Sequence, residues 1–227
     1  MYEKGKGNPP QTEHTLRDRP YSRTGARPRG WKPLYRGEDV SRYRLARPTE
    51  FVHYGEWLAA PRTTDLFESP KILMRRTDDR LMACLEKDSG ICVNSCHVIR
   101  LSHEVSFSYE YLLGLLNSRL LQWIFEIQNP QMVGKVFAEV KVVYVERLPI
   151  RVISVGTGSE RAVGDRLTGL VRRRVSLEDV ITRRRTEQEK DDLERQVAAL
   201  DRQIDQLVYE LYGLTDEEIR IVEEATS

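Results

Sequence analysis

The sequence has no long hydrophobic run, little cysteine and no recognisable leader. None of its 227 residues lie in a stretch that approaches the roughly 18 consecutive apolar residues of a membrane helix. The opening residues "MYEKGKGNPPQTEH" contain no apolar signal region. Three cysteines, an odd number, give no disulfide framework in a chain of this size. These absences predict a cytoplasmic protein without a membrane segment.

Familiar catalytic patterns are missing as well. No histidine lies in a Gly-x-Ser-x-Gly or Cys-His context, which would indicate a hydrolase. Gly156-Thr157-Gly158 lacks the third glycine and the βαβ frame of a phosphate-binding loop, so a linker explains it better. We therefore predict no catalytic residue on this chain. The histidines considered are His14, His53, His97 and His103.

A metal site is the next possibility to weigh. Cys92, Cys96 and His97 lie close together, and Cys84 is nearby. On a strand, positions 92 and 96 face the same side. However, no second Cys-x-x-Cys pair completes a four-ligand set. Buried core cysteines are therefore the better interpretation, and no metal is predicted.

The stretch "GNPPQT" at residues 7–12 looks like a catalytic loop of amino-group DNA methyltransferases, in which Asn-Pro-Pro precedes an aromatic residue that stacks on a flipped-out base. Here Gln11 takes the place of that aromatic residue, and no Gly-rich cofactor loop follows an apolar strand. The machinery of such an enzyme is absent, so Asn8-Pro9-Pro10 is interpreted as a turn-prone part of a tail.

The net charge of +1 conceals an uneven distribution. Residues 1–100 carry 19 Lys and Arg against 13 Asp and Glu, a net of +6, and residues 101–185 carry 13 against 9, a net of +4. Residues 186–227 carry 4 against 13, a net of −9. A basic body could bind a polyanion, whereas the acidic C-terminal segment could not.

The chain divides into segments by composition. Residues 1–30 are rich in glycine, proline and arginine and are predicted to be a flexible or loosely docked basic segment, most simply a solvated tail and alternatively a phosphate-contacting arm. Apolar positions at helical spacing predict one helix over 107–127. "VGTGSE" at 155–160 is the best linker. Strands are predicted at 51–58, 71–77, 80–86, 91–101 and 139–145.

After the linker the sequence becomes helical. Residues 160–212 contain no proline and many Glu, Arg, Gln and Leu. Gly213 stands where a helix should stop, and Thr215 with Glu218 forms a capping box that predicts a helix over 216–225. Apolar residues at alternating steps of four and three form a seam suited to a coiled-coil-like hairpin or a partner helix. The seam comprises Leu193, Val197, Leu200, Ile204, Leu207 and Leu211.

These patterns predict a mixed α+β fold: a small twisted β-sheet with packed helices, followed by a long-helix, coiled-coil-like extension. The predicted units are the flexible segment 1–30, a central domain over 31–154, and a helical C-terminal region over 155–227 with its heptad seam at 193–211.

Five stretches, in this order, resemble the TaqI-like C-terminal specificity domain, the target-recognition domain of N6-adenine DNA methyltransferases and of type IIG restriction-modification enzymes. The C-terminal "DRQIDQLVYELYGLTDEEIRIVE" (201–223) is also similar to the usual ending of these enzymes. The five stretches are "PLYRGEDVSRY" (33–43), "SPKILMRRTDDRLMACLE" (69–86), "CVNSCHVIRL" (92–101), "YLLGLLNSRLLQWIF" (111–125) and "GKVFAEVKVVYVERLPI" (134–150).

The resemblance implies a DNA target-recognition module that reads double-stranded DNA from the major-groove side. It also implies a separate methyltransferase subunit or domain, which would bind S-adenosylmethionine and methylate adenine, so no cofactor is expected on this chain. The alternative is a protein-protein assembly subunit that uses its C-terminal helices and does not read DNA.

The DNA-contacting candidates are six cations and one amide. Arginine is well suited to bidentate contact with guanine or phosphate. Asn94 could read adenine or cap a strand end, and Arg42 could instead pair with Asp39. The candidates are Arg36, Arg42, Arg75, Arg76, Arg80, Asn94 and Lys135.

Overall fold

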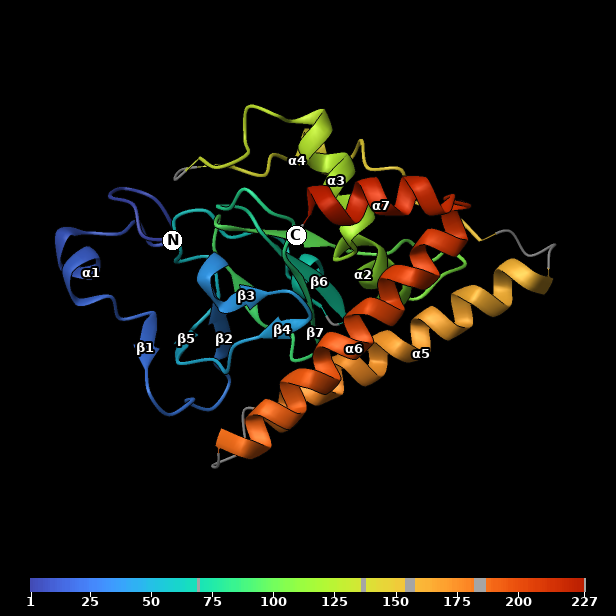
Figure 1. Cartoon of the computed structure of the whole chain (residues 1–227). Coiled ribbons are helices and arrows are strands. Elements are labelled where there is room, and N and C mark those ends of the chain that lie inside the picture. The colour runs from blue at the N-terminus through green and yellow to red at the C-terminus, as the bar shows by residue number, and fades with distance from the viewer. Residues whose placement is uncertain (69, 136–137, 154–157, 182–186, 227) are drawn as a thin grey trace.

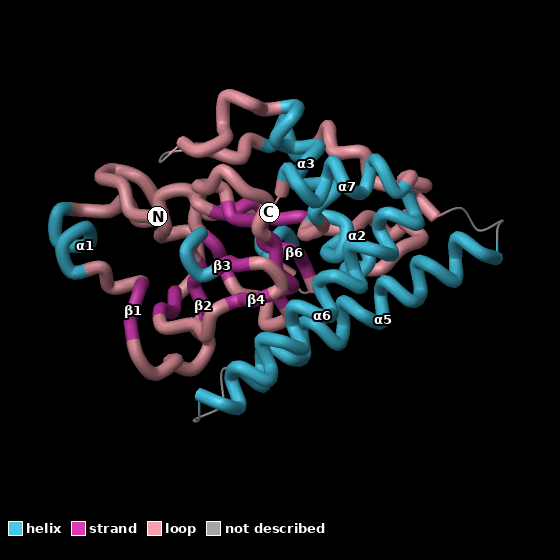
Figure 2. Tube along the Cα trace, viewed as in Figure 1, coloured by secondary structure: helices cyan, strands magenta, loops and turns pink. Residues whose placement is uncertain are grey.

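The computed structural model describes residues 1–68, 70–135, 138–153, 158–181 and 187–226. Its α+β fold places small sheets on one side and long helices on the other (Figures 1 and 2). The helices are α1 (Glu13–Asp18), α2 (Tyr109–Leu116), α3 (Arg119–Gln128), α4 (Val142–Val145), α5 (Gly158–Ile181), α6 (Glu187–Tyr212) and α7 (Asp216–Ala225), with 3-10 turns η1 (Gly37–Asp39) and η2 (Thr64–Phe67). Every helix in the described ranges is too short or too polar to cross a bilayer.

Three sheets contain all the described strands. The first has the order β1-β5-β2-β8 and is antiparallel except for the parallel pair β2 and β8. A second sheet is the two-residue hairpin β3-β4, and the third has the antiparallel order β7-β6-β9. The strands are β1 (Ser22–Thr24), β2 (Lys32–Tyr35), β3 (Val40–Ser41), β4 (Arg44–Leu45), β5 (Glu50–Val52), β6 (Lys71–Arg75), β7 (Ala83–Glu86), β8 (Ile91–Cys92) and β9 (Cys96–Ile99).

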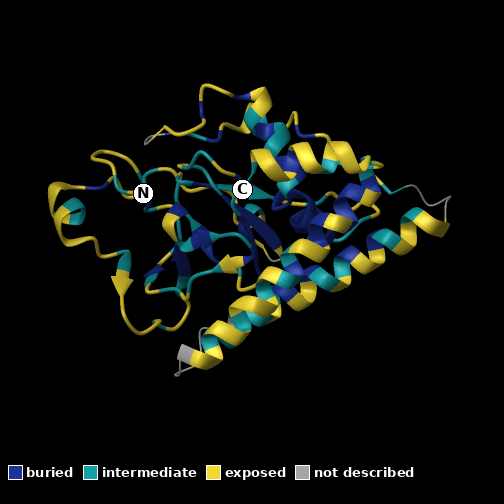
Figure 3. Cartoon of the chain, in the orientation of Figure 1, coloured by how far each residue is buried: buried dark blue, intermediate teal, exposed yellow. Residues whose placement is uncertain are grey.

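The main core lies between the β7-β6-β9 sheet and the helices. Ile72 and Met74 of β6 are fully buried against α2, whose Leu113 and Leu115 are fully buried too. Side chains of α5, α6 and α7 join the same cluster, so the C-terminal helices share a core with the sheet (Figure 3). Burial of this apolar surface is the main stabilising contribution of the arrangement.

Four of the six residues of the predicted seam are buried within this chain. Helices α5 and α6 run antiparallel side by side, as the hairpin alternative predicted (Figure 1). Ile204 is 1% exposed, and the remaining contacts of α6 include α2 and α3. Leu193 and Val197, toward the far end of the hairpin, are half-buried. The buried members are Leu200, Ile204, Leu207 and Leu211.

Buried charges also fasten the helical hairpin to the body. The Arg174 guanidinium of α5 donates to Asp201 at 2.7 Å and to Glu178 at 2.6 Å, and it lies 5.1 Å from the ring centre of Tyr43. On α6, Asp205 accepts a 2.9 Å hydrogen bond from the Arg119 N–H at the start of α3. Such groups need partners because they lie out of water.

One predicted element is wrong, and two others are each divided in two. The strand expected at 139–145 is a short helix, α4, over Val142–Val145. The single helix expected at 107–127 is two, α2 and α3. The Ser118 hydroxyl caps α3 by accepting from the Leu121 N–H at 3.2 Å, and Asn117 before it hydrogen-bonds β7. The strand expected at 91–101 is also two, β8 and β9, and the strands expected at 51–58, 71–77 and 80–86 are present but shorter. The linker residues 155–157 lie outside the described ranges, and α5 starts at Gly158.

The N-terminal segment is docked, which corrects the expectation of a flexible tail. It contains α1 and β1, and β1 pairs with β5. The Asn8 N–H donates to the Glu56 carbonyl at 2.7 Å, and buried Gln11 donates to the Trp57 carbonyl at 2.9 Å. Asn8-Pro9-Pro10 therefore fixes the segment against the loop after β5.

The end of the chain follows its sequence signals closely. Gly213, at φ +71°, ends the α6 turn, and the Thr215 hydroxyl accepts from the Glu218 N–H in a capping box. Helix α7 then spans Asp216–Ala225 as predicted.

Candidate nucleic-acid interface

Three loops meet at one end of the β7-β6-β9 sheet and bring most of the predicted contact residues together. These loops are the β6-β7 hairpin loop, the turn between β8 and β9, and the segment after α3. The Arg76 N–H donates to the Ser95 carbonyl at 2.9 Å, and the Val140 N–H donates to the Arg76 carbonyl at 2.8 Å. The Gly134 N–H donates to the Asp79 carboxylate at 3.1 Å. Backbone bonds thus hold the surface defined by residues 75–80, 93–95 and 133–135, called here the hairpin surface.

Arg75 and Arg76 of the hairpin are each held by a different carboxylate. The Arg75 Nε lies 3.2 Å from the Asp78 carboxylate within the same loop. Arg76 donates from Nε to Glu139 at 2.7 Å and from Nη1 to the Asn94 carbonyl at 3.0 Å. The hydrogen bond from Arg76 holds the pKa of the Glu139 carboxyl below its usual range. Both arginines are fixed in position, and their charges are partly compensated.

Two other cations on the hairpin surface are uncompensated. Arg80 and Lys135 are exposed, and their charged groups have no hydrogen-bond or ion-pair partner among the described residues. Asn94 is exposed, and its backbone carbonyl accepts from Arg76. The surface therefore offers two free positive charges together with two positioned arginines and one exposed amide.

Arg36 and Arg42 have roles within the fold. The Arg36 guanidinium donates to Glu50 of β5 at 2.6 Å. Arg42 donates to the Asn117 carbonyl at 2.6 Å, at the C-terminal end of α2, where the helix dipole favours a cation. The suggested pair of Arg42 with Asp39 is not formed: the Asp39 carboxylate accepts from the Arg36 N–H at 2.7 Å.

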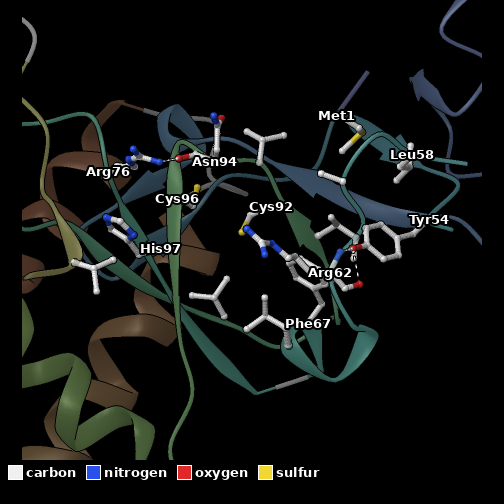
Figure 4. A pocket seen from close by; sticks show the side chains of 16 residues that line it. Met1, Tyr54, Leu58, Arg62, Phe67, Arg76, Cys92, Asn94, Cys96 and His97 are labelled. Carbon is white, nitrogen blue, oxygen red and sulfur yellow. Dashed lines mark hydrogen bonds between the residues drawn. The ribbon is translucent and has the colours of Figure 1, made fainter. Parts of the chain in front are cut away.

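A cleft of about 680 Å³ continues the hairpin surface toward the β1-β5-β2-β8 sheet. Figure 4 shows Arg76, Asn94 and His97 at one end of this cleft, and Tyr54, Leu58 and Arg62 at the other. No carboxylate lines it among the described residues. Its charged side chains, among the described residues, are Arg62 and Arg76, so its electrostatics favour an anionic occupant.

Two of the three cysteines, Cys92 and Cys96, line this cleft. Cys84 and Cys96 are buried in a small apolar cluster, in agreement with the interpretation of core cysteines. Burial raises the pKa of the Cys84 thiol. A hydrogen bond from the Cys96 thiol lowers the pKa of the Cys92 thiol, which is half-buried at the cleft wall.

Sequence reasoning missed the carboxylates that orient the arginines. Glu139 lies 63 positions from Arg76, and Glu50 lies 14 from Arg36. It also missed Arg62 of the cleft. No local pattern marks these pairs, because they form only when distant loops meet. A partial signal for Glu139 was available in the resemblance, whose fifth stretch contains it.

Comparison with known families matches residues 32–150, slightly more than half of the chain, to the TaqI-like C-terminal specificity domain. The chain is also similar to a Methanocaldococcus jannaschii protein named "Putative type II restriction enzyme and methyltransferase". The two are 26% identical over 166 residues, which cover 71% of this chain and 13% of that relative. This chain thus corresponds to a small part of the relative's length.

Proposed function

This chain belongs to the family of TaqI-like C-terminal specificity domains, and we propose that it is the sequence-reading module of an adenine-specific DNA methyltransferase or restriction-modification system. The observation that carries the proposal is the coincidence of this family match with the cationic hairpin surface, which lies inside the matched residues. Catalysis and S-adenosylmethionine binding belong, in this proposal, to a separate subunit or domain that this chain accompanies.

Duplex DNA would use the two kinds of cation differently. Arg80 and Lys135 are free to contact phosphate, which contributes affinity but no sequence information. Arg75 and Arg76 are held in fixed positions, which suits contact with base edges in the major groove, and Asn94 places an exposed amide beside Arg76. Arginine pairs well with guanine, and asparagine pairs well with adenine. Arg36 and Arg42 would act mainly by supporting this surface.

The distribution of charge supports one orientation of the duplex. Residues 186–227 carry a net charge of −9, and their exposed acidic side chains lie on α6 and α7. Phosphates would be repelled from these helices. The duplex is therefore proposed to lie against the hairpin surface, with the exposed sides of α6 and α7 directed away from it.

A salt titration with matched variants tests the proposal. Anisotropy of a labelled duplex pool is measured between 50 and 200 mM salt for the wild type and for the double variant Arg80→Gln, Lys135→Gln. Loss of two phosphate contacts should lower the slope of log affinity against log salt by about 1.8. Arg202→Gln, which removes an exposed cation on α6, is the control and should leave the slope unchanged.

Sequence reading needs its own measurement. Selection of bound duplexes from a random pool, with the catalytic partner present, should enrich one motif for the wild type. Asn94→Ala should relax one position of that motif and cost about 1–3 kcal/mol on the preferred base. Duplex binding that does not depend on salt would contradict the proposal. So would an enriched motif that stays the same in all three variants, Asn94→Ala, Arg75→Gln and Arg76→Gln.

A further inference from the structure

Five aromatic rings form a continuous row at one end of the β1-β5-β2-β8 sheet. Tyr2 stacks on Tyr21 with ring centres 6.4 Å apart, and Tyr21 lies 5.7 Å from Trp57. Trp57 lies 4.4 Å from His53, which stacks on Trp31 at 5.6 Å and an interplanar angle of 16°. The row is outside the hairpin surface and has no role in the duplex binding proposed above.

Strand pairing explains why these rings meet. β5 lies between β1 and β2 and is antiparallel to both, so the residue after β5 lies beside the residues that precede β1 and β2. These three residues are His53, Tyr21 and Trp31. The His53 N–H donates to the Tyr21 carbonyl at 2.9 Å, and the Trp57 indole N–H donates to the His53 carbonyl at 2.8 Å. The row is therefore fixed by backbone geometry.

The row reaches solvent. His53 is exposed, and Tyr2, Tyr21, Trp31 and Trp57 are half-buried. Tyr21 and Trp57 also pack against the cluster under the sheet, which anchors them. Side chains placed in this way can offer ring surface to a ligand without first rearranging.

Uncompensated arginines flank the row. Residues 17–36 contain seven Lys and Arg against one Asp. Among these cations, Arg19, Arg23 and Arg29 are exposed, and their guanidinium groups have no hydrogen-bond or ion-pair partner among the described residues. Arg23 is two residues from Tyr21, and Arg29 is two residues from Trp31. These charges are therefore close in the chain to two members of the row, Tyr21 and Trp31.

We infer that the aromatic row, comprising Tyr2, Tyr21, Trp57, His53 and Trp31, binds single-stranded nucleic acid together with Arg19, Arg23 and Arg29. Unpaired bases stack on the rings, and the phosphates between them lie against the arginines. A duplex suits this site poorly, because its bases already stack on one another and present only their edges. The exposed rings supply stacking surface, and the free arginines near them in the chain supply the positive charge that the phosphates of one strand need.

The site is separate from the hairpin surface. β2 and β8 are parallel, and both run toward the turn at 93–95. The aromatic row lies at the start of β2, so about four residues, or roughly 13 Å of strand, separate the two sites. A protein that opens or encounters unpaired DNA could hold one strand here while the hairpin surface holds duplex.

Tryptophan fluorescence provides the first test. Trp31 and Trp57 are two of the three tryptophans in the chain, and Trp123 is packed on α3 against the main core. Titration of the full chain with a 16-nucleotide oligo(dT) at 50 mM salt should quench the emission and saturate. No quenching at millimolar nucleotide concentration overturns the inference.

Variants then separate stacking from charge, with binding measured by anisotropy of a labelled oligo(dT). Trp31→Leu should weaken binding about tenfold, as expected for loss of one stacked base. The double variant Arg23→Gln, Arg29→Gln should lower the salt slope by about 1.4, or 0.7 for each phosphate. Arg202→Gln should change neither value. Both arginines are exposed, so the double variant remains a valid test if Trp31→Leu impairs folding.

Two comparisons complete the design. An abasic oligonucleotide of equal length should compete at least tenfold more weakly than oligo(dT); equal competition would show a phosphate contact without stacking and overturn the inference. The hairpin variant Arg80→Gln, Lys135→Gln should bind oligo(dT) normally, while the Arg23→Gln, Arg29→Gln variant should bind duplex normally. Failure of one site is therefore distinguishable from failure of the other. If both variants lose both ligands equally, there is no separate single-strand site.

Discussion

Asp205 should make the stability of this protein fall as pH rises from about 4 to 6. Its carboxyl is 4% exposed on α6 and accepts a 2.9 Å hydrogen bond from the Arg119 N–H. Burial raises its pKa from 3.8 to about 6, although that hydrogen bond and the charges of Arg42 and Arg119 oppose the shift. Desolvation of the carboxylate outweighs its partners at this site.

Proton binding decides the direction in which stability changes with pH. Between pH 3.8 and about 6, the folded protein holds a proton on Asp205 that the unfolded chain has lost, so the free energy of unfolding falls as pH rises. The loss is complete only well above pH 6, where Asp205 is ionised in both states. A pKa difference of this size corresponds to about 3 kcal/mol of unfolding free energy.

Asp205→Asn removes the charge and keeps an oxygen that can accept from the Arg119 N–H. We expect the variant to exceed the wild type in unfolding free energy by about 3 kcal/mol more at pH 7.5 than at pH 4. Urea unfolding of both proteins at four pH values measures this difference. Other carboxyl groups titrate in the same range, but they are common to both proteins and cancel in the comparison.

Parallel stability curves for the two proteins would refute the reasoning. A constant difference between them would mean that Asp205 is ionised throughout the range. A variant that loses stability at pH 7.5 would mean that the attraction of Arg42 and Arg119 outweighs desolvation. Asp201→Asn serves as a contrast, because its carboxylate receives a 2.7 Å hydrogen bond from Arg174 and its loss should destabilise the protein at neutral pH.

Three further substitutions probe the fold and the hairpin surface. Ile204→Asp places a charge at a position that is 1% exposed, so it should cost more than about 4 kcal/mol and unfold the chain in urea titrations, without merely separating subunits in light scattering. Gly37→Ala puts a Cβ 2.7 Å from the Ser95 carbonyl oxygen, so it should cost about 1–3 kcal/mol and weaken duplex binding in anisotropy measurements by shifting the 93–95 turn. Glu139→Gln releases Arg76 and should raise duplex affinity severalfold at low salt, while changing thermal stability by less than about 1 kcal/mol because the pair is exposed.

Short sequence patterns were sufficient to predict the structure where it depends on residues close together in the chain. The capping box at Thr215 and the positive φ of Gly213 depend on residues within one helical turn, and both were predictable. The alternating seam on α6 was also predictable as a pattern. Its partner was not, because the same apolar spacing serves an intramolecular hairpin or a second chain.

The predictions from sequence were wrong where contacts between distant residues override the local preference for a helix or a strand. The run "VKVVYV" at 140–145 has strong strand propensity, but β-propensity requires a neighbouring strand to pair with. At this position Val140 instead donates to Arg76, and the next residues turn into α4. Gln11 is another example, because its burial depends on the Trp57 carbonyl 46 residues away. A composition rich in glycine, proline and arginine predicts a tail correctly only when no distant contact holds the segment against the body.

The same limit applies to the hairpin surface, with a consequence for recognition. Sequence reasoning can find arginines, but the carboxylates that hold them come from elsewhere in the chain. Arg76 is oriented by Glu139, whereas the Arg80 side chain has no partner in the part of the chain that the structure describes. A phosphate that displaced Glu139 from Arg76 would gain little net charge interaction, because it would replace one anion with another. A base edge would bind an Arg76 side chain that Glu139 has already oriented, which avoids much of the entropy cost of ordering that side chain. Arg80 and Lys135 should therefore dominate salt dependence, and Arg76 should affect specificity more than affinity.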